Sequence, residues 1–179
     1  MQPDWPITTE RLVLRPFEEG DFAGLLAIYA DEEVARYLYH EPRGEPEVRE
    51  LLARKIAGSW IGQEGHWLGA AATRDGELVA DIVMHWVSEQ HKTAEIGFSV
   101  HPRHQGQGYA TEGARALVDW AFAQGFHRVI GRLEVRNIAS ARVLEKLGMR
   151  REAHLVENEW VKGEWQSELV YAILDREWR

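Results

Sequence analysis

Two glycines, Gly106 and Gly108, interrupt the chain between a strand-like run and its most regular helical pattern. After them, the segment 109–124 repeats apolar residues at helical spacing, and Gly125 stands where a left-handed cap is expected. Glycines at such a junction leave backbone N–H groups uncovered, and the start of a helix adds partial positive charge. The loop therefore predicts either a tight turn or a binding site for a phosphate or pyrophosphate group.

The common nucleotide-binding loops do not fit this segment. A dinucleotide fingerprint needs a third glycine where Thr111 stands, and a Walker A loop needs Gly-Lys-Ser/Thr where Tyr109 follows Gly108. A protein-kinase loop lies between two strands, whereas this loop opens a helix. The spacing that is present is Arg-x-x-Gly-x-Gly, with Arg103 as its first residue.

The rest of the chain predicts one α+β domain over residues 1–179. The pairs Asp75-Gly76 and Lys162-Gly163 mark the turns of two hairpins. In the helix predicted over 46–61, Lys55 joins the apolar residues on one face. The predicted strands are 7–16, 67–73, 78–86, 94–100, 129–135, 150–161 and 164–174, and the predicted helices are 21–29, 33–38, 46–61, 109–124 and 137–147.

Four motifs in this order resemble the GNAT superfamily of acyl-CoA-dependent N-acetyltransferases. The Arg-x-x-Gly-x-Gly loop is similar to the family's pyrophosphate loop, and the strand 94–100 is similar to the strand that precedes it. The segment 135–149 resembles the family's Asn-x-x-Ser helix, followed by Glu-Lys-x-Gly and a hydrophobic residue. The opening residues 9–16 resemble the branch of ribosomal-protein N-terminal (Rim-type) acetyltransferases. The resemblance spans residues 7–175, nearly the whole chain.

The resemblance implies a GNAT-like fold, with one mixed, mostly antiparallel central sheet of about seven strands and about four or five helices. It also implies that strands 94–100 and 129–135 splay apart and admit the pantetheine arm of acetyl-CoA, the cosubstrate. Main-chain groups of the first strand would bond the pantetheine amides as an added strand would. The residues that the resemblance assigns to cofactor binding are Phe98, Ser99, Val100, Arg103, His104, Gln105, Gly106, Gln107, Gly108, Tyr109, Ala110, Asn137 and Ser140.

Asn137 and Ser140 each have two interpretations. Asn137 is a helix N-cap, worth about 1 kcal/mol, and the matching residue of the family also contacts the cofactor. Ser140 is an ordinary first-turn serine or, as the resemblance implies, the catalytic group that protonates the departing thiolate of CoA. The chain contains no cysteine, so a thiolate nucleophile is excluded. The resemblance implies direct attack by the amine in a ternary complex.

The acceptor amine must lose a proton before it attacks, because an alkyl ammonium with a pKa of about 10 is mostly charged at pH 7. Glu95, in the strand that lines the predicted cleft, is the first candidate for this catalytic base. Its other interpretation is a solvent-side residue paired with a neighbour such as Lys92. The remaining candidates, all in the final hairpin, are Glu157, Glu159 and Glu168.

The charge balance argues against several partners. Lys and Arg total 21 and Asp and Glu total 29, so the net charge is −8 at pH 7. An acidic chain is a poor partner for nucleic acid and a better one for cations, so the arginines at 128, 132, 136, 142, 150 and 151 are expected to serve solvent and cofactor. His101 and His104 lack acidic ligands nearby, so no metal is expected. No secretory signal or membrane-spanning run is visible, so a cytoplasmic protein with no membrane contact is expected.

Two functions are compatible with these patterns. The first is an acetyl-CoA-dependent N-acetyltransferase acting on a primary amine, either a small molecule or a protein N-terminus, with residues 39–63 choosing the acceptor. The second is a non-catalytic acyl-CoA-binding or regulatory module, because a fold does not fix an activity. Thiol release from acetyl-CoA in the presence of amines distinguishes the two. The sequence leaves both a monomer and a homodimer open.

Overall fold

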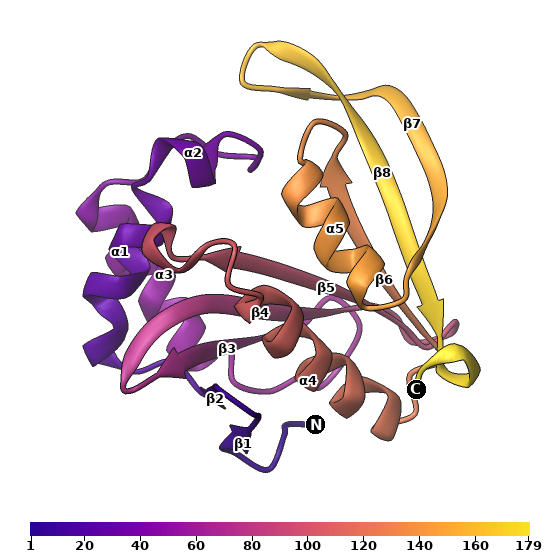
Figure 1. Cartoon of the computed structure of the whole chain (residues 1–179), viewed down its shortest axis with the longest axis horizontal. Coiled ribbons are helices and arrows are strands. Elements are labelled where there is room, and N and C mark those ends of the chain that lie inside the picture. The colour runs from indigo at the N-terminus through magenta and orange to yellow at the C-terminus, as the bar shows by residue number, and fades with distance from the viewer.

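The computed structural model describes all 179 residues and contains one eight-stranded sheet in the order β1-β2-β3-β4-β5-β6-β8-β7 (Figure 1). Only β5 and β6 are parallel neighbours. The strands are β1 (Ile7–Thr8), β2 (Val13–Arg15), β3 (Trp67–Arg74), β4 (Glu77–Ser88), β5 (Thr93–Val100), β6 (Arg128–Glu134), β7 (Arg150–Val161) and β8 (Glu164–Leu174). The helices are α1 (Phe22–Tyr29), α2 (Glu32–Ala35), α3 (Glu45–Ala57), α4 (Tyr109–Ala123) and α5 (Ile138–Lys146). The mixed, mostly antiparallel α+β fold is confirmed.

The N-terminal segment forms two short strands instead of the single strand predicted over 7–16, which is why the sheet has eight strands instead of about seven. Thr9 and Leu12 close a turn between them, with the Thr9 N–H donating to the Leu12 carbonyl at 2.9 Å and the Leu12 N–H donating to Thr9 Oγ1 at 3.0 Å. Ile7 then lies opposite Leu14. The turn contains neither glycine nor proline, so the sequence carried no signal that would divide the strand.

Two helices are shorter than predicted. α3 ends at Ala57 and not at residue 61, because Gly58 leaves the helical conformation with φ −90° and ψ 49°. α2 has four residues, whereas the prediction extended to residue 38. The other helices and strands are confirmed with ends that differ by one or two residues, within the usual uncertainty of such boundaries. No helix combines the length and the apolar composition needed to cross a bilayer.

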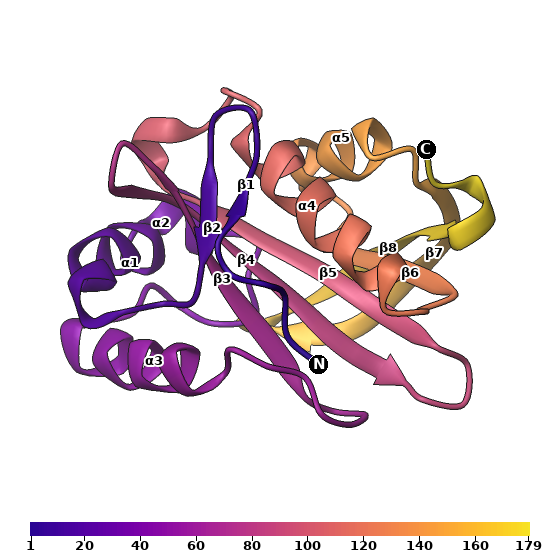
Figure 2. The same ribbon diagram turned by 90° about the horizontal axis from the view of Figure 1, so that it is seen from below.

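The sheet separates two apolar cores, with helices on both of its faces (Figure 2). Because side chains alternate along a strand, Ala70 and Ala72 of β3 face α4, whereas Ala71 faces α1 and α3. The core on the α4 and α5 side holds 29 buried residues and the core on the α1 and α3 side holds 9.

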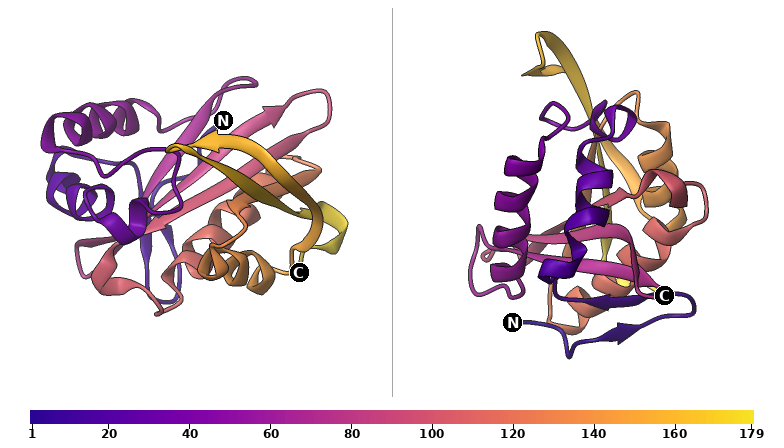
Figure 3. Two further views of the ribbon diagram at one scale, coloured as in Figure 1. Left: turned by 90° about the horizontal axis from the view of Figure 1, so that it is seen from above. Right: turned by 90° about the vertical axis from the view of Figure 1, so that its left-hand side faces the viewer.

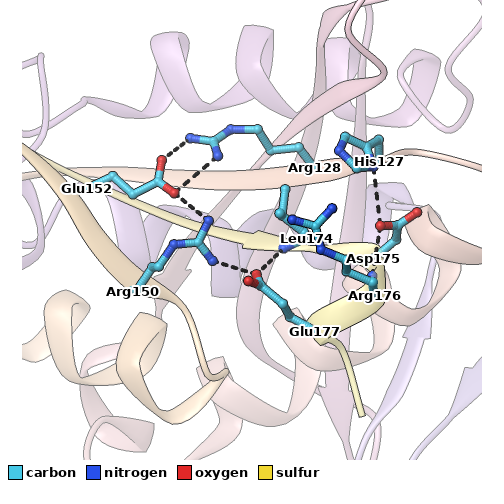
Figure 4. A network of polar contacts seen from close by, with 8 residues as sticks. All are labelled: His127, Arg128, Arg150, Glu152, Leu174, Asp175, Arg176 and Glu177. Atoms are coloured by element: carbon cyan, nitrogen blue, oxygen red, sulfur yellow. Dashed lines mark hydrogen bonds and ion pairs between the residues drawn. The ribbon is translucent and has the colours of Figure 1, made fainter.

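The β7–β8 hairpin extends from one edge of the sheet toward α2 (Figures 1 and 3). Near its tip, Lys162 Nζ donates to the carbonyl oxygen of Ala35 at 2.6 Å. At its base, ion pairs and hydrogen bonds join β6, β7 and the C-terminal turn (Figure 4). The residues of this base network are His127, Arg128, Arg150, Glu152, Leu174, Asp175, Arg176 and Glu177. The hairpin is therefore held at its base by this network and at its tip by the contact with Ala35.

Most of the clustered arginines are paired inside the molecule. The pairs are Arg128 with Glu152, Arg132 with Glu95, Arg136 with Glu134 and Glu164, and Arg150 with Glu152 and Glu177. These carboxylates offset the positive charge, so the cluster does not form an open basic surface.

Candidate active site

The glycine loop has a left-handed backbone at both of its glycines. Gly106 has φ +74° and Gly108 has φ +85°, and Gly108 is the N-cap of the fifteen-residue helix α4. Residues with a side chain rarely adopt these angles, and a Cβ atom on Gly108 would lie 3.4 Å from Nη2 of Arg11. The free N–H groups of the first helical turn favour an anion at this position. The loop thus meets the geometric requirement of a phosphate site.

Two charged residues that the sequence reasoning missed, Arg11 of the N-terminal hairpin and Glu112 of α4, hold this loop in place. Arg11 Nη1 donates to the carbonyl oxygen of Gln107 at 2.9 Å, and Arg11 Nε donates to Glu112 at 2.7 Å. Glu112 also accepts from Thr9 Oγ1 at 2.6 Å. Burial by itself would raise the pKa of Glu112, but the hydrogen bonds from Thr9 and Arg11 together lower it below its usual value. Because Arg11 and Glu112 are 101 residues apart, no local pattern could have indicated the contact.

The other predicted loop residues can contact a ligand through main-chain groups more readily than through side chains. Tyr109 is 1% exposed and Ala110 is buried, so their side chains are not available to a ligand. The exposed members are Arg103, Gln105, Gly106 and Gln107, and His104 is half-buried. His101 Nδ1 accepts from the Arg103 N–H at 3.2 Å, and partial burial lowers the pKa of His101. No group of three or more His, Asp or Glu side chains is arranged to hold a metal ion.

The parallel pairing of β5 with β6 stops after three residues, Thr93 to Glu95. On its other side, β5 stays paired with β4 as far as Val100, and β6 pairs with β8 along its whole length. One edge of β5 from Ile96 to Val100 therefore has no strand opposite it, which confirms the predicted splay. An extended ligand can bond to such an edge through main-chain groups.

The start of α5 lies beside this open edge. Asn137 Oδ1 accepts from the Ser140 N–H at 3.0 Å, which confirms Asn137 as the N-cap. This bond leaves the side-chain amide nitrogen of Asn137 and the hydroxyl of Ser140 free for a ligand. Both residues line the same cavity as Phe98 and Ser99 of β5.

This cavity has a volume of about 280 Å³ and is built from five parts of the chain. Its walls come from β4, β5, the end of β6, α5, and the region of α1 and α2. The polar residues of this lining are Tyr29, Tyr37, Tyr39, Asp81, His85, Ser99, Arg132, Glu134, Asn137 and Ser140. The cavity therefore connects the predicted cofactor edge with side chains from distant segments.

Glu95 lies where β5 and β6 separate, and its partner is Arg132 instead of the neighbouring Lys92. Arg132 Nη2 donates to Glu95 Oε2 at 2.9 Å, and Arg132 Nε lies 3.2 Å from both carboxylate oxygens. His85 lies opposite Glu95 on β4, and burial lowers the pKa of His85. Both oxygens of Glu95 already accept hydrogen bonds, so a proton taken from an amine would compete with Arg132.

Glu168, on β8, has a different environment. Glu168 is 4% exposed, and one of its carboxylate oxygens accepts a hydrogen bond from the Tyr39 hydroxyl at 3.2 Å. Burial raises the pKa of Glu168, with Arg132 opposing the shift and Glu159 adding to it. Of the other candidates, Glu159 is half-buried and Glu157 is exposed. A carboxyl group with a raised pKa is better matched to proton transfer near neutral pH.

Asp81 and Tyr29 of the cavity wall belong to a buried charge network with Lys55. The sequence reasoning missed this network as well. Asp81 of β4 is 1% exposed, and its Oδ2 accepts from Lys55 Nζ and from the Tyr29 hydroxyl, each at 2.6 Å. The other oxygen, Oδ1, is buried and has no partner. Burial and the charge of Asp81 raise the pKa of Tyr29, so this phenol stays protonated and donates. The one signal in the sequence was the place of Lys55 on the apolar face of its helix.

Comparison with known proteins gives one consistent result. Residues 11–150 match the family model described as an acetyltransferase (GNAT) domain. The uncharacterized N-acetyltransferase YnaD of Bacillus subtilis is 33% identical over 173 residues, which cover 96% of this chain and 98% of YnaD. The crystal structure of a GNAT-family acetyltransferase from Bacillus anthracis has a TM-score of 0.86 at 31% identity and covers 96% of this chain and 99% of its own. The spermidine N(1)-acetyltransferase of Vibrio cholerae is 25% identical over 158 residues, 87% of this chain and 88% of that protein.

Proposed function

Since this chain belongs to the GNAT family of acetyltransferases, we propose that it transfers the acetyl group of acetyl-CoA directly to a primary amine in the cavity between β5 and α5. Membership of this family identifies the chain as an N-acetyltransferase. The proposal concerns which acceptor it uses and by which mechanism. One observation carries it: the open edge of β5 shares a single cavity with Asn137 and Ser140.

The residues present fit CoA in two places. The left-handed glycines at 106 and 108 and the first turn of α4 suit a pyrophosphate group. The edge from Ile96 to Val100 suits the two amides of a pantetheine arm, because it offers main-chain donors and acceptors in an extended row. When bound, acetyl-CoA supplies the activated acetyl group.

Ser140 is the proposed proton donor to the departing thiolate. Its hydroxyl is half-buried in the cavity wall and makes no hydrogen bond within the protein, so it is free to donate. Its position in the first turn of α5 also favours negative charge on the group that it faces. Asn137 fixes this turn through its bond to the Ser140 N–H.

The proposed base is a carboxylate that contacts a residue of the cavity wall, either Glu95 through Arg132 or Glu168 through Tyr39. Glu95 stays a candidate, but its oxygens are held by Arg132. Glu168 meets the requirement better, because burial raises its pKa and because Tyr39, in the cavity wall, donates to it. A proton from the amine would reach Glu168 through the Tyr39 hydroxyl or through one water molecule.

Two features support different acceptors. The spermidine acetyltransferase among the relatives supports a small cationic amine. The Rim-type opening motif at residues 9–16 supports a protein N-terminus, and membership of that branch stays a prediction. A cytoplasmic location and a homodimer also stay predictions.

The test is thiol release from acetyl-CoA, measured with n-butylamine and with a short peptide that has a free N-terminus. We expect release that depends on amine concentration, together with acetylated amine in equal amount. Binding of CoA by calorimetry provides the parallel readout. Tight CoA binding without acetylation of either amine would contradict amine transfer and leave an acyl-CoA-binding module as the function.

A further inference from the structure

Asp81 lines the cavity, and one of its two carboxylate oxygens has no hydrogen-bond partner in the protein. Lys55 and Tyr29 both donate to its Oδ2, whereas its Oδ1 is buried without a partner. An ionised carboxylate accepts on both oxygens, and a buried acceptor left unsatisfied is costly. A purely structural ion pair would be more stable with both oxygens bonded. The missing partner is therefore a donor that is not part of this chain.

The position of Asp81 relates this oxygen to the proposed reaction. Asp81 lies opposite Ser99 in the β4–β5 register, one strand away from the open edge of β5. Asp81 and Ser140 line the same cavity. A small ligand can therefore contact Asp81 at one end while its other end lies against α5.

The charges around the cavity indicate which kind of hydrogen-bond donor would bind to Asp81. Lys55 is paired with Asp81, Arg132 with Glu95, and Arg136 with both Glu134 and Glu164, whereas Glu168 forms no ion pair. Carboxylates are thus in excess. Three tyrosines, Tyr29, Tyr37 and Tyr39, belong to the wall, and tyrosine faces attract cations. A cationic N–H donor therefore fits better than a neutral hydroxyl group.

We propose that Asp81 binds a second ammonium group of the acceptor, so that the preferred acceptors are diamines instead of monoamines. The inference rests on the proposed amine acetylation and names the substrate class of that same cavity. Lys55 and Tyr29 act as positioning residues that hold the carboxylate. Lys55 is itself fixed between the rings of Phe17 and Trp67, with its nitrogen 5.1 Å and 5.3 Å from their centroids.

The first experiment uses the wild-type chain saturated with CoA. Calorimetry compares 1,3-diaminopropane, 1,4-diaminobutane and 1,5-diaminopentane, each with the n-alkylamine of the same chain length. At least one diamine is expected to bind about tenfold more tightly than its monoamine, as one hydrogen bond to a charged group provides. Equal affinity throughout the series overturns the Asp81 site, and an ordered water on Oδ1 would give that result.

The second experiment removes the carboxylate without leaving a buried charge unpaired. Lys55→Met and Asp81→Asn are combined, because either change alone leaves one charge buried without its partner. The double variant should bind the diamine and the monoamine equally and keep its affinity for CoA. Glu50→Gln, which removes one exposed negative charge from the same helix α3, should keep the diamine preference. A preference that persists in the double variant overturns the assignment.

Thiol release separates this inference from the proposed function. Acetylation of monoamines and diamines at equal efficiency and equal affinity would contradict the Asp81 site and support amine transfer. Preferential diamine binding that is lost in the double variant, without acetylation of any amine, would support the site and contradict the transfer.

Discussion

The two sides of the candidate site are built by different means. On the cofactor side, the groups offered to a ligand belong to the backbone: the open edge of β5 and the N–H groups around Gly106 and Gly108. On the proposed acceptor side they belong to side chains that line the cavity, among them Tyr39, Asp81 and Arg132. The backbone side depends on local conformation, whereas the side-chain side depends on contacts between distant residues.

This difference indicates how one fold serves many acceptors. A backbone site tolerates most side-chain changes, provided that its glycines remain and its strands stay apart. A site of buried carboxylates changes its preference when a single partner changes, because each charge depends on its neighbours. We therefore expect changes on the two sides to affect separate quantities, namely cofactor affinity on one side, and turnover and acceptor choice on the other.

The largest effect is expected for Ser140→Ala, at the junction of the two sides. Removing a proton donor typically lowers turnover by about 10²–10⁴-fold. Acetyl-CoA affinity should change little, because the open edge of β5 and the glycine loop are intact. Steady-state kinetics and calorimetry measure the two quantities, and Ser59→Ala, outside the cavity wall, is the matched control. A fall in affinity with unchanged turnover would make Ser140 a cofactor contact instead of an acid.

A smaller effect is expected for Gly108→Val. The substitution forces a branched residue into φ +85° and brings its Cβ against Arg11. The dissociation constant of acetyl-CoA should rise at least tenfold, or about 1.4 kcal/mol. Gly125→Val is the matched control, since Gly125 has φ +87° at the far end of α4 and should lose stability without losing CoA affinity. Equal CoA affinity in the two folded variants would remove the loop from the site.

The smallest effect is expected in the pH dependence of Glu168→Gln. Burial raises the pKa of Glu168 above its usual 4.5, so the wild-type protein loses the stability contributed by this group as pH rises through the raised pKa. The stability of Glu168→Gln relative to wild type should therefore increase with pH over that range, as measured by urea unfolding.

The turnover of Glu168→Gln relative to wild type should also depend on pH. It should be lower than that of wild type near neutral pH, and the deficit should shrink at high pH, where the amine no longer needs a base. Glu95→Gln is the comparison, because it removes the other candidate base, whose carboxylate is paired with Arg132. If only Glu95→Gln shows a deficit that shrinks with pH, Glu95 is the base and Glu168 is not.

The parts that could be predicted from sequence are those whose signals are local. Helix α4, the β7–β8 hairpin and the cap at Asn137 depend on apolar periodicity, a glycine turn and one polar side chain, all within a few residues. The left-handed cap at Gly125 was predictable for the same reason.

The parts that escaped prediction depend on contacts far along the chain. The nearby Lys92 was one expected partner of Glu95, but Arg132, 37 residues away, binds it through the β5–β6 neighbourhood. Tyr29 and Asp81 are 52 residues apart. The sequence around each of them indicates only an ordinary helix residue for Tyr29 and an ordinary strand residue for Asp81. Only packing brings them together, so a single sequence carries almost no sign of the acceptor side.

The early end of the β5–β6 pairing links cofactor binding to the stability of the fold. With three residue pairs between these strands, the remaining amides on the open edge of β5 should exchange their hydrogens quickly in the free protein. CoA seated on that edge would protect them. A ligand present at 100 times its dissociation constant raises the free energy of unfolding by about 2.7 kcal/mol. The cellular supply of CoA would then govern how often this sheet opens, and with it the rate at which proteases remove the protein.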